Sequence, residues 1–470
     1  MLKVFDEVNS LDKKCYEEYG LSEDILMEHA SSSMLSFIED RFKENSKILI
    51  VSGAGNNGAD GIALARLLKG KYEVVLFCPY GTKSEMSIVQ SKRALLVEVE
   101  ISHSYSLILD KYDLVVDCLF GTGLNKNLDE SSIKIIEQLN TLDSYKLSCD
   151  IPSGINNIGQ ISTIAFKADT TITMGALKKS LFTDQSKDFI GDLVVANLGI
   201  QRELYEDDTK CYLLEESDLK LPYREKLSTH KGDFGHLAVF IGSKSGAGVI
   251  SCEAGFSFGC GLVTAISGDK DIPYHIMNSE SLPLNTTAIA VGMDLGTSYD
   301  KNMLNNNIPK VIDADIFYDD YILELLKQDN IVLTPHPKEF ISLLKLTNLA
   351  NINIEELQNN RFKYLNLFCS SYKNVVLLLK GANTLIGYND TVYINNLGNS
   401  ILSFGGSGDV LSGLIGSLLA QGYSCIDATI NGSLSHCIAS TNYTYSNYSL
   451  TPNGLIEEIK QLPKTSIKKF

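Results

Sequence analysis

The chain has 470 residues, of which 44% are hydrophobic and 21% charged, a composition typical of globular proteins and unlike that of a disordered chain. This length predicts two to three domains, at roughly 150 residues per domain. The formal net charge of −16 and the lack of a long Lys/Arg run exclude a basic stripe for nucleic acid. Small anionic ligands are compatible with this charge, because backbone N–H groups bind phosphate without net positive charge.

Ten cysteines are spread singly along the chain, with no C-x-x-C pair and no histidine cluster at metal-ligand spacing. This pattern predicts reduced, buried thiols. The first residues, MLKVFDEVNSLDKK, lack the apolar stretch of a secretory signal, and no run approaches the roughly 18 apolar residues that span a membrane. We therefore expect a cytoplasmic protein without a membrane segment.

The first half alternates short apolar runs with helical patterns. Ser22 is the expected N-cap of a helix with an apolar face, since Glu23 and Asp24 follow it in the first turn. Apolar runs on both faces are typical of strands covered by helices on two sides, and they predict an α/β fold with a doubly wound, mostly parallel sheet. The expected strands are 47–52, 72–77, 113–120, 145–150 and 169–174.

The strand and helix rhythm weakens between about 199 and 229, where charged stretches appear. We therefore predict a domain over 1–205, a linker over 206–229 and a second domain over 230–470. An Asn389-Asp390 turn between two apolar runs predicts a hairpin, and the last clear helix is expected to open at Gly408 and close near Gly422. Further strands are expected within 236–242, 262–267, 288–292, 310–315, 330–335 and 374–381.

The stretch GAGNNGADG at 53–61 has the glycine spacing of a dinucleotide-binding fingerprint. That fingerprint needs an acidic residue at the end of the second strand to hold the ribose, but this strand ends in Cys78-Pro79. The loop also places Asn56, Asn57 and Asp60 where a pyrophosphate cradle mainly presents backbone. These features disfavour an NAD-dependent oxidoreductase.

Other polar residues fall where neighbouring strands end: Asp117 in DCLFGTGL, Asp150 and Ser153 in DIPSG, and Lys178 in TMGALKK. The carboxyl ends of parallel strands form one crevice, so these groups should converge into an acid/base site that suits a hard cation. An Asp before a glycine turn is often only a cap, and a lone Lys is usually solvated. Their joint placement favours a site.

With LMEHAS upstream, these segments resemble, in order, the N-terminal domain of the NAD(P)H-hydrate epimerase family. The resemblance implies a Rossmann-like domain and assigns Asn57, Asp117 and Ser153 to K⁺. Our mechanistic hypothesis is that Asp150 and Lys178 transfer the protons. Two departures, Ala59 for a usual Gly and Lys179-Ser180 for Pro-Gly, remove no reacting group. The implied contacts with the hydrate are Asn56, Asn57, Gly58, Ala59, Asp60, Gly121, Thr122, Gly123, Leu124, Asn125, Lys126, Asn127 and Asp150.

In the second half, FGGSGDVLSG lets backbone N–H groups at a helix start face one point, which predicts an anion hole. Asp409 in its first turn is placed as a general base for a hydroxyl. The alternative is a Gly-rich helix start with an acidic cap. LLLKGANT, with Lys380 at a strand end, predicts a cradle for a nucleotide, and TPHPKE places His336 at another strand end.

The segments HKGDFG, GAGVISCEAG, DAD, LTPHPKE, LKGANT and GGSGD are similar, in order and spacing, to the ADP/ATP-dependent NAD(P)H-hydrate dehydratases. The resemblance implies a ribokinase-like α/β domain. Departures are Met293-Asp294 for Pro-Gly and Ser407 for Thr; an extra carboxylate at Asp294 would alter substrate affinity if it faces the site. The hydrate is implied to contact Ala247, Gly296, His336 and Asp409, and the adenine nucleotide Lys380, Gly381, Ala382, Asn383, Thr384 and Gly408.

Fused epimerase and dehydratase domains form a known bifunctional repair enzyme. The resemblance therefore predicts that the R and S forms of hydrated NADH and NADPH (NADHX and NADPHX) are interconverted, and that the S form is dehydrated at the expense of ADP or ATP. It also implies K⁺ in the first domain, Mg²⁺ on the nucleotide and a homo-oligomer, with no nucleic-acid or membrane partner. The alternatives are a ribokinase-superfamily small-molecule kinase with an N-terminal ligand-binding module, and a non-catalytic first half.

Overall fold

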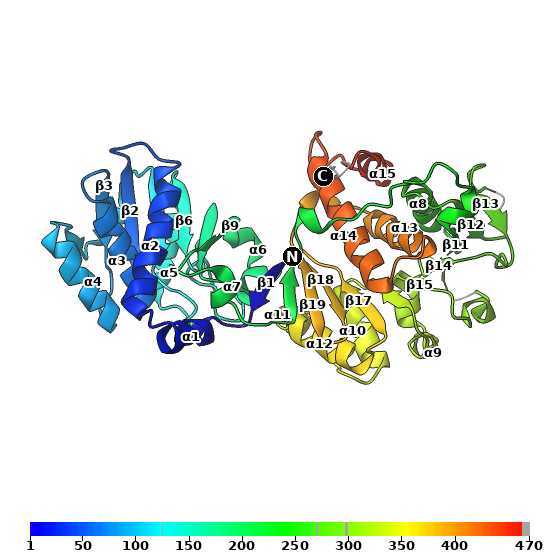
Figure 1. Cartoon of the computed structure of the whole chain (residues 1–470), viewed down its shortest axis with the longest axis horizontal. Coiled ribbons are helices and arrows are strands. Elements are labelled where there is room, and N and C mark those ends of the chain that lie inside the picture. Colours follow the sequence, from blue (N-terminus) through cyan, green and yellow to red (C-terminus); the bar gives the residue numbers. More distant parts are fainter. Residues whose placement is uncertain (125, 269–270, 297–298, 463–470) are drawn as a thin grey trace. The chain divides into compact units, whose positions relative to one another are not determined.

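The computed structural model describes residues 1–124, 126–268, 271–296 and 299–462. The chain divides into two compact units, Lys3–Thr209 and Lys210–Phe470, the second of which also takes in Met1–Leu2. Each unit is built on its own mainly parallel sheet with helices packed against it (Figure 1). Among the described residues no helix is both long and apolar enough to cross a membrane.

The N-terminal unit has a sheet of parallel strands in the order β4-β3-β2-β5-β6-β7-β9. The chain moves outwards from β2 to β4 and then restarts on the other side of β2 with β5. This reversal is the switch point of a doubly wound, Rossmann-like fold, and ligands bind there at the carboxyl ends of the strands. The strands are β2 (Lys47–Ser52), β3 (Glu73–Phe77), β4 (Ile101–Ser102), β5 (Leu114–Cys118), β6 (Tyr145–Cys149), β7 (Thr170–Met174) and β9 (Asp192–Ala196).

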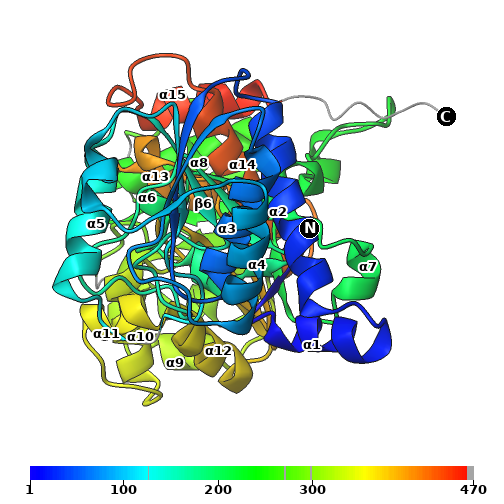
Figure 2. The same cartoon turned by 90° about the vertical axis from the view of Figure 1, so that its left-hand side faces the viewer.

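Two hydrophobic cores sandwich this sheet, which explains why its strands are apolar on both faces. Ile48 and Ile50 of β2 pack into a core with α2, α3 and α4, whereas Leu49 and Val51 pack into another core with α5. Figure 2 shows α5 on one side of the strands and α2, α3 and α4 on the other. The helices of this unit are α1 (Asn9–Glu18), α2 (Glu23–Glu39), α3 (Asn56–Leu68), α4 (Glu85–Leu96), α5 (Glu130–Thr141), α6 (Lys187–Ile190) and α7 (Arg202–Tyr205).

Two short elements of this unit pair with each other outside the seven-stranded sheet. β1 (Leu2–Phe5) pairs in parallel with β8 (Leu177–Lys178), so that Phe5 lies beside Lys178 in the register. The predicted start of α2 is confirmed, because the Ser22 hydroxyl accepts from the backbone N–H of Ile25 at 3.4 Å. Backbone pairing with β1 fixes the position of β8, which carries the predicted site residue Lys178.

The C-terminal unit has a sheet in the order β13-β12-β11-β14-β15-β16-β17-β18-β19-β10. Its pairs are parallel except β17 with β18 and β18 with β19, which are antiparallel and include the predicted hairpin. This is the ribokinase-like α/β architecture that the sequence led us to expect. The strands are β10 (Cys211–Leu213), β11 (His236–Phe240), β12 (Leu262–Ile266), β13 (Met277–Ser279), β14 (Ala288–Val291), β15 (Lys310–Ile312), β16 (Ile331–Leu333), β17 (Val375–Leu379), β18 (Thr384–Tyr388) and β19 (Thr391–Asn395).

Two features of this unit differ from the sequence interpretation. The segment 206–229 contains β10, which pairs in parallel with β19. The predicted last helix is followed by two more, α14 and α15. α14 is buried from Ala428 to Ser440, and the sequence interpretation overlooked its apolar positions Ile430, Leu434 and Ile438, which stand among small and polar residues. The helices are α8 (Ser245–Ser257), α9 (Ile322–Leu325), α10 (Pro337–Leu346), α11 (Ile354–Asn359), α12 (Arg361–Ser371), α13 (Ser407–Ala420), α14 (Cys425–Asn442) and α15 (Pro452–Lys460).

A buried lysine at the start of β15 stabilises this unit. The Lys310 ammonium donates to the carbonyl oxygens of Asn306 and Ile308, at 2.6 and 2.8 Å, and to Gln328 Oε1 at 2.9 Å. Burial lowers the pKa of Lys310 to about 8. Its role is structural, because these acceptors are tied together by one ammonium group.

We expect Lys310→Met to lower the free energy of unfolding of the C-terminal unit by about 3 kcal/mol, since buried acceptors lose their donor at about 1–3 kcal/mol each. Lys327→Met is the matched control: this exposed lysine pairs with Glu324 at 2.7 Å, and the change should stay within about 0.5 kcal/mol. Urea unfolding followed by circular dichroism measures both. Equal stabilities for the two variants would contradict the assignment.

Candidate active sites

A cavity of about 980 Å³ opens at the carboxyl ends of the strands in the N-terminal unit. Of the residues predicted to touch substrate, Ala59 lies buried in α3 and does not line the cavity, and Asn125 lies outside the described residues. The structure brings the others together although they come from four chain segments. Those lining the cavity are Asn56, Asn57, Gly58, Asp60, Gly121, Thr122, Gly123, Leu124, Lys126, Asn127, Asp150 and Lys178.

The glycine spacing of the first loop follows from close backbone packing. A Cβ added at Gly53 would lie 1.9 Å from the carbonyl oxygen of Leu119, and one added at Gly58 would lie 1.9 Å from that of Gly53. Only glycine permits this approach of the loop, the start of α3 and the end of β5. The spacing therefore reports how the loop packs, and it leaves the ligand to be identified by the polar side chains.

Asp117 and Ser153 form a buried pair beneath the cavity. The Asp117 carboxylate accepts from Ser153 Oγ at 2.6 Å and from the backbone N–H groups of Ser153 and Leu119 at 2.8 and 3.1 Å. Burial raises the pKa of Asp117 to about 6, against the opposing effect of these hydrogen bonds. Both side chains are almost fully buried, so they lie behind the cavity wall.

These residues fit a monovalent cation that prefers oxygen ligands. Ser153 Oγ donates to Asp117 and accepts from the Phe120 N–H at 2.8 Å, which leaves one lone pair on the hydroxyl oxygen, and Asn57 supplies an amide. The Asn57 nitrogen is buried without a hydrogen-bond partner among the described residues, and turning the amide over would place its oxygen there. One carboxylate, one hydroxyl and one amide oxygen give the low ligand charge that suits K⁺.

Asp150 and Lys178 form a buried ion pair that lines the same cavity. Lys178 Nζ lies 2.5 Å from Asp150 Oδ1 and 2.7 Å from Thr173 Oγ1, and its residue is 1% exposed. Asp150 has a positive φ of 69° and also accepts from the Met174 N–H at 3.1 Å. A non-glycine residue in the left-handed region is uncommon, and here the contacts with Lys178 and Met174 hold the Asp150 side chain in this position.

Asp12 of α1 is among the carboxylates of this cavity that sequence reasoning missed, and it accepts from the hydroxyl of Tyr205 at 2.7 Å. Its segment, NSLDKKCYEE, has the composition of an ordinary surface helix. No local signal could have found it, because its partner stands 193 positions further along the chain.

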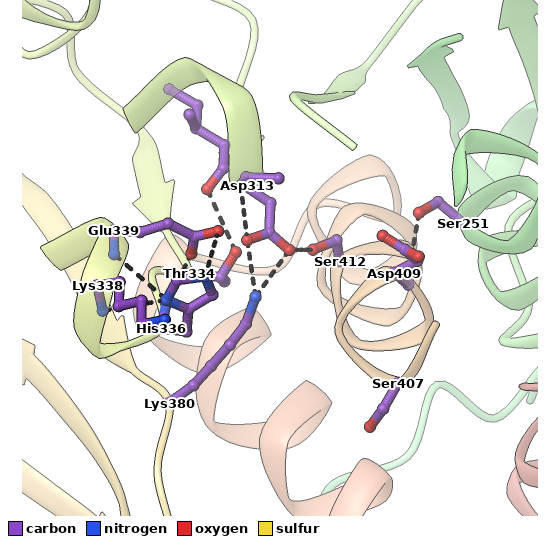
Figure 3. A network of polar contacts seen from close by, with 12 residues as sticks. Ser251, Asp313, Thr334, His336, Lys338, Glu339, Lys380, Ser407, Asp409 and Ser412 are labelled. Carbon is purple, nitrogen blue, oxygen red and sulfur yellow. Dashed lines mark hydrogen bonds and ion pairs between the residues drawn. The ribbon is translucent and has the colours of Figure 1, made fainter. Parts of the chain in front are cut away.

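The second site surrounds the start of α13 (Figure 3). Gly406 is the N-cap, with a φ of 96°, and Asp409 lies in the first turn, where Ser251 Oγ donates to its backbone carbonyl oxygen at 2.8 Å. Burial, and next the neighbouring Asp313 carboxylate, raise the pKa of Asp409 to about 6. The helix start offers an anion site beside a carboxylate that can accept a proton near neutral pH. Ser407 Oγ lies 3.1 Å from His436 Nε2.

Lys380 projects from the end of β17 towards this helix start. Its ammonium lies 2.7 and 2.9 Å from the two carboxylate oxygens of Asp313, and Ser412 Oγ donates to Asp313 at 2.7 Å (Figure 3). A Cβ added at Gly408 would lie 3.1 Å from Lys380 Nζ. A cation is thus held against the anion hole by a buried carboxylate from the DAD motif.

A buried arginine shapes the loop 380–384, which was predicted to hold the nucleotide. Arg361 of α12 is 3% exposed and donates to the carbonyl oxygens of Leu379, Lys380 and Asn383 at 3.2, 3.0 and 2.9 Å. Sequence reasoning missed Arg361, because a single arginine in a helix gives no hint of its partners. With these carbonyls held inwards, the loop keeps one backbone conformation.

His336 caps α10 at the edge of this site. Its Nδ1 accepts from the backbone N–H groups of Lys338 and Glu339 at 3.1 and 3.2 Å, so Nε2 carries the proton of the neutral ring. Burial raises the pKa of Glu339 to about 7. The histidine has a structural function whatever it binds, and the Nε2 of its half-exposed ring lies 3.1 Å from Glu339 Oε1.

Two predicted contacts follow β14. Gly296 has a φ of 69° and donates its N–H to Asp315 Oδ2 at 2.8 Å, and Asp294 has a φ of 47°. The Asp294 carboxylate contributes to the raised pKa of Asp409, so the departure at 294 acts electrostatically on this site. Ala247 lies in the first turn of α8. Within the described ranges no three His, Cys, Asp or Glu side chains cluster as metal ligands.

Two α/β units, one with a buried Asp–Lys pair in a cavity and one with a carboxylate at an anion-binding helix start, define an enzyme with two chemically different sites. The family described as YjeF-related protein N-terminus matches residues 23–180, and the family described as NAD(P)H-hydrate dehydratase matches 237–461. The chain is 43% identical over 469 residues to the bifunctional NAD(P)H-hydrate repair enzyme Nnr of Helicobacter pylori, covering 98% of this chain and 100% of that one. It therefore belongs to the family of bifunctional NAD(P)H-hydrate repair enzymes.

Two further relatives match the C-terminal unit. The ADP-dependent (S)-NAD(P)H-hydrate dehydratase of Neisseria meningitidis is 33% identical over 234 residues, which cover 44% of this chain and 77% of that protein. The crystal structure of the ADP/ATP-dependent NAD(P)H-hydrate dehydratase from Bacillus subtilis, co-crystallised with ATP/Mg²⁺, is 23% identical and covers 53% of this chain and 96% of that one, with a TM-score of 0.45.

Proposed function

We propose that the N-terminal cavity interconverts the R and S forms of NADHX and NADPHX, and that the site at Asp409 dehydrates the S form. The observation that carries this proposal is the presence, in a chain of this family, of a buried acid–base pair in one unit and a carboxylate beside an anion hole in the other. NADHX carries a hydroxyl on the carbon next to the ring nitrogen. Epimerisation exchanges that hydroxyl between the two faces, and dehydration removes it.

In the N-terminal cavity, Asp150 and Lys178 would transfer the protons of this exchange. The ring nitrogen supplies the electron pair that forms an iminium as the C–O bond breaks, and the departing oxygen leaves as water once it has gained a proton. Lys178 is hydrogen-bonded to Asp150 and Thr173, which fix its ammonium in one position. The proposed substrate contacts Asp60, 121–124 and 126–127 line the same cavity as this pair.

Asn57, Asp117 and Ser153 would hold K⁺. A bound K⁺ supplies a positive charge that orients the substrate hydroxyl. Asp117 and Ser153 already hold each other through two hydrogen bonds, so the oxygen atoms are fixed before the ion arrives. Replacing K⁺ in the buffer by tetramethylammonium, which cannot shed its methyl groups to reach these oxygens, should lower epimerisation and leave dehydration at fixed Mg²⁺ unchanged.

In the C-terminal site, Asp409 would deprotonate the hydroxyl of the S epimer, whose oxygen attacks the terminal phosphorus of ADP. AMP leaves, the proton stays on Asp409, and the ring nitrogen then expels phosphate to give an iminium that loses a ring proton and becomes NADH. Gly408 and the loop 380–384 would bind the nucleotide, and Ala247, Gly296 and His336 the hydrate. Mg²⁺, bound to the nucleotide phosphates, supplies charge neutralisation. The Neisseria relative supports ADP over ATP.

The dehydration rate should fall as the pH falls through about 6, because the raised pKa of Asp409 leaves its carboxyl protonated below that value. At pH 5 we expect roughly one tenth of the plateau rate above pH 7. Asp313→Asn should move the midpoint to lower pH, since the Asp313 charge raises the pKa of Asp409 and Lys380 lowers it. Turnover at saturating ADP and hydrate across pH 4.5–8 measures both; a midpoint unchanged by the substitution would contradict this electrostatic coupling.

One assay tests the whole proposal: the purified chain is mixed with both epimers, ADP, Mg²⁺ and K⁺, and recovery of dihydronicotinamide absorbance is followed. Full recovery is expected, and no recovery would overturn the proposal. A stable phosphorylated product would favour the ribokinase-superfamily kinase, the alternative suggested by the GGSGD motif. We also propose a cytoplasmic location, supported by the ten cysteines spread singly along the chain, and a homo-oligomer, which light scattering would test.

A further inference from the structure

The epimerase cavity contains a carboxylate that the proposed chemistry has not used. Asp12 of α1 lines this cavity together with Asp60, Asp150 and Lys178, and it comes from an element outside the sheet. The pair Asp150–Lys178 stands at the end of β6 and on β8, whereas Asp12 projects from the helix that follows β1. Acidic groups therefore reach one cavity from separate parts of the unit.

Asp12 is held in place by a buried tyrosine. The Tyr205 hydroxyl donates to Asp12 Oδ1 at 2.7 Å, and Tyr205 is 2% exposed. The ring fits because residue 175 is glycine: a Cβ added there would lie 2.5 Å from the Tyr205 ring. Gly175 belongs to the same TMGALKK segment that presents Lys178, so one segment positions the lysine and makes room for the tyrosine.

The charges around Asp12 make it a group that can exchange protons. Burial raises its pKa, while the Tyr205 hydrogen bond and the Lys178 ammonium lower it and the Asp150 and Glu23 charges raise it. Burial also raises the pKa of Tyr205, which therefore stays a hydrogen-bond donor. Burial, and next the Asp150 and Asp12 charges, likewise raise the pKa of Asp60. The positive charge of Lys178 thus opposes the effect of the nearby carboxylates on the pKa of Asp12.

The reaction needs more than one acid–base group. For either epimer, a proton must reach the hydroxyl oxygen as the C–O bond breaks, and a base must take a proton from the water that forms the new C–O bond. Leaving and returning water stand on opposite faces of one ring carbon, so a single fixed carboxylate cannot serve both. Two acid–base groups, exchanging roles with the direction of reaction, satisfy the chemistry.

We propose that Asp12 is this second acid–base residue of the epimerase site, with Tyr205 as its positioning residue. The inference rests on the proposed epimerisation. In one direction the Asp150–Lys178 pair protonates the leaving hydroxyl, the ring nitrogen forms the iminium, and the Asp12 carboxylate takes the proton of the incoming water. In the reverse direction the protonated Asp12 carboxyl supplies the proton, so that protons and electron pairs balance over the cycle.

The test compares Asp12→Asn, Asp12→Glu and Tyr205→Phe in the full chain, with chromatographic measurement of R-to-S exchange without nucleotide. We expect about a 100-fold loss of kcat with little change in KM for Asp12→Asn, partial recovery for Asp12→Glu, and a smaller loss with a displaced pH profile for Tyr205→Phe. Glu17→Gln, on the same helix with a side chain 65% exposed, is the matched control and should retain the parental rate.

Dehydration of the pure S epimer by the same molecules reports on the C-terminal site and shows whether a loss is confined to epimerisation. Epimerisation within threefold of the parent in Asp12→Asn would overturn the inference. So would an equal loss in all three variants with an unchanged pH profile and a lowered melting temperature, which is the signature of a purely structural contact. If the parent itself does not epimerise, the proposed function fails instead, and the two failures are therefore distinguishable.

Discussion

Asp409→Asn is expected to abolish dehydration of the S epimer while R-to-S exchange continues at the parental rate. The amide keeps the size of the side chain but cannot take the hydroxyl proton, and removal of a general base costs about 10²- to 10⁴-fold. The backbone contact from Ser251 to the carbonyl oxygen of residue 409 is kept, so the start of α13 stays in place. Recovery of dihydronicotinamide absorbance from the S epimer measures the loss.

The control for this substitution is Asp427→Asn. Asp427 is also an acidic residue in the first turn of a helix, but there its carboxylate accepts from the capping Ser424 hydroxyl at 2.6 Å. It should lose only a few tenths of a kcal/mol of stability and no activity. Loss of both activities in Asp409→Asn would show that the two sites are not independent.

Lys178→Met should abolish epimerisation, with dehydration of the S epimer unchanged. The substitution removes the ammonium that lies 2.5 Å from Asp150 Oδ1 and leaves a largely buried carboxylate without its cation. Breaking a buried pair in this way costs about 3–5 kcal/mol of stability, and loss of the proton-transferring group lowers the rate by at least about 100-fold. Exchange of the epimers and thermal unfolding measure the two effects.

A double variant separates stability from chemistry. Lys178→Met combined with Asp150→Asn removes both charges and should recover most of the lost stability without recovering epimerisation. Lys179→Met, which breaks the neighbouring ion pair with Asp6 at 2.8 Å, should leave both activities near parental values. Epimerisation by the double variant at the parental rate would contradict a proton-transfer role for this pair.

Local sequence signals determined the architecture of both units. Strands such as Lys47–Ser52 could be predicted because a run that is apolar on both faces suits a sheet covered on both sides. Ser22 could be predicted as an N-cap because its hydroxyl accepts from a backbone N–H group of the first turn. The polar groups at strand ends, Asp150 and Lys178 among them, could be placed together because parallel strands all end at one edge. Periodicity and connectivity are properties of neighbouring residues.

The glycine fingerprint shows where a local signal misleads. Its spacing is that of a dinucleotide loop, but Gly53 and Gly58 are required by the approach of Leu119 and by the packing of α3 against its own loop. The missing acid at the end of the second strand disfavours an oxidoreductase, and membership of the repair family agrees with that. The tertiary contacts supply the physical reason for the glycines.

By itself, the sequence determined the two-unit α/β order, the strands and the polar groups at their ends, because each depends on residues close together in the chain. Only the tertiary structure decided that Tyr205 holds Asp12, that Arg361 holds the loop 380–384, and that Asp313 holds Lys380. Each is a hydrogen bond between residues far apart in sequence. Burial and the charges of such distant neighbours set the proton affinity of a carboxylate, so the chemistry of these sites exists only in the folded chain.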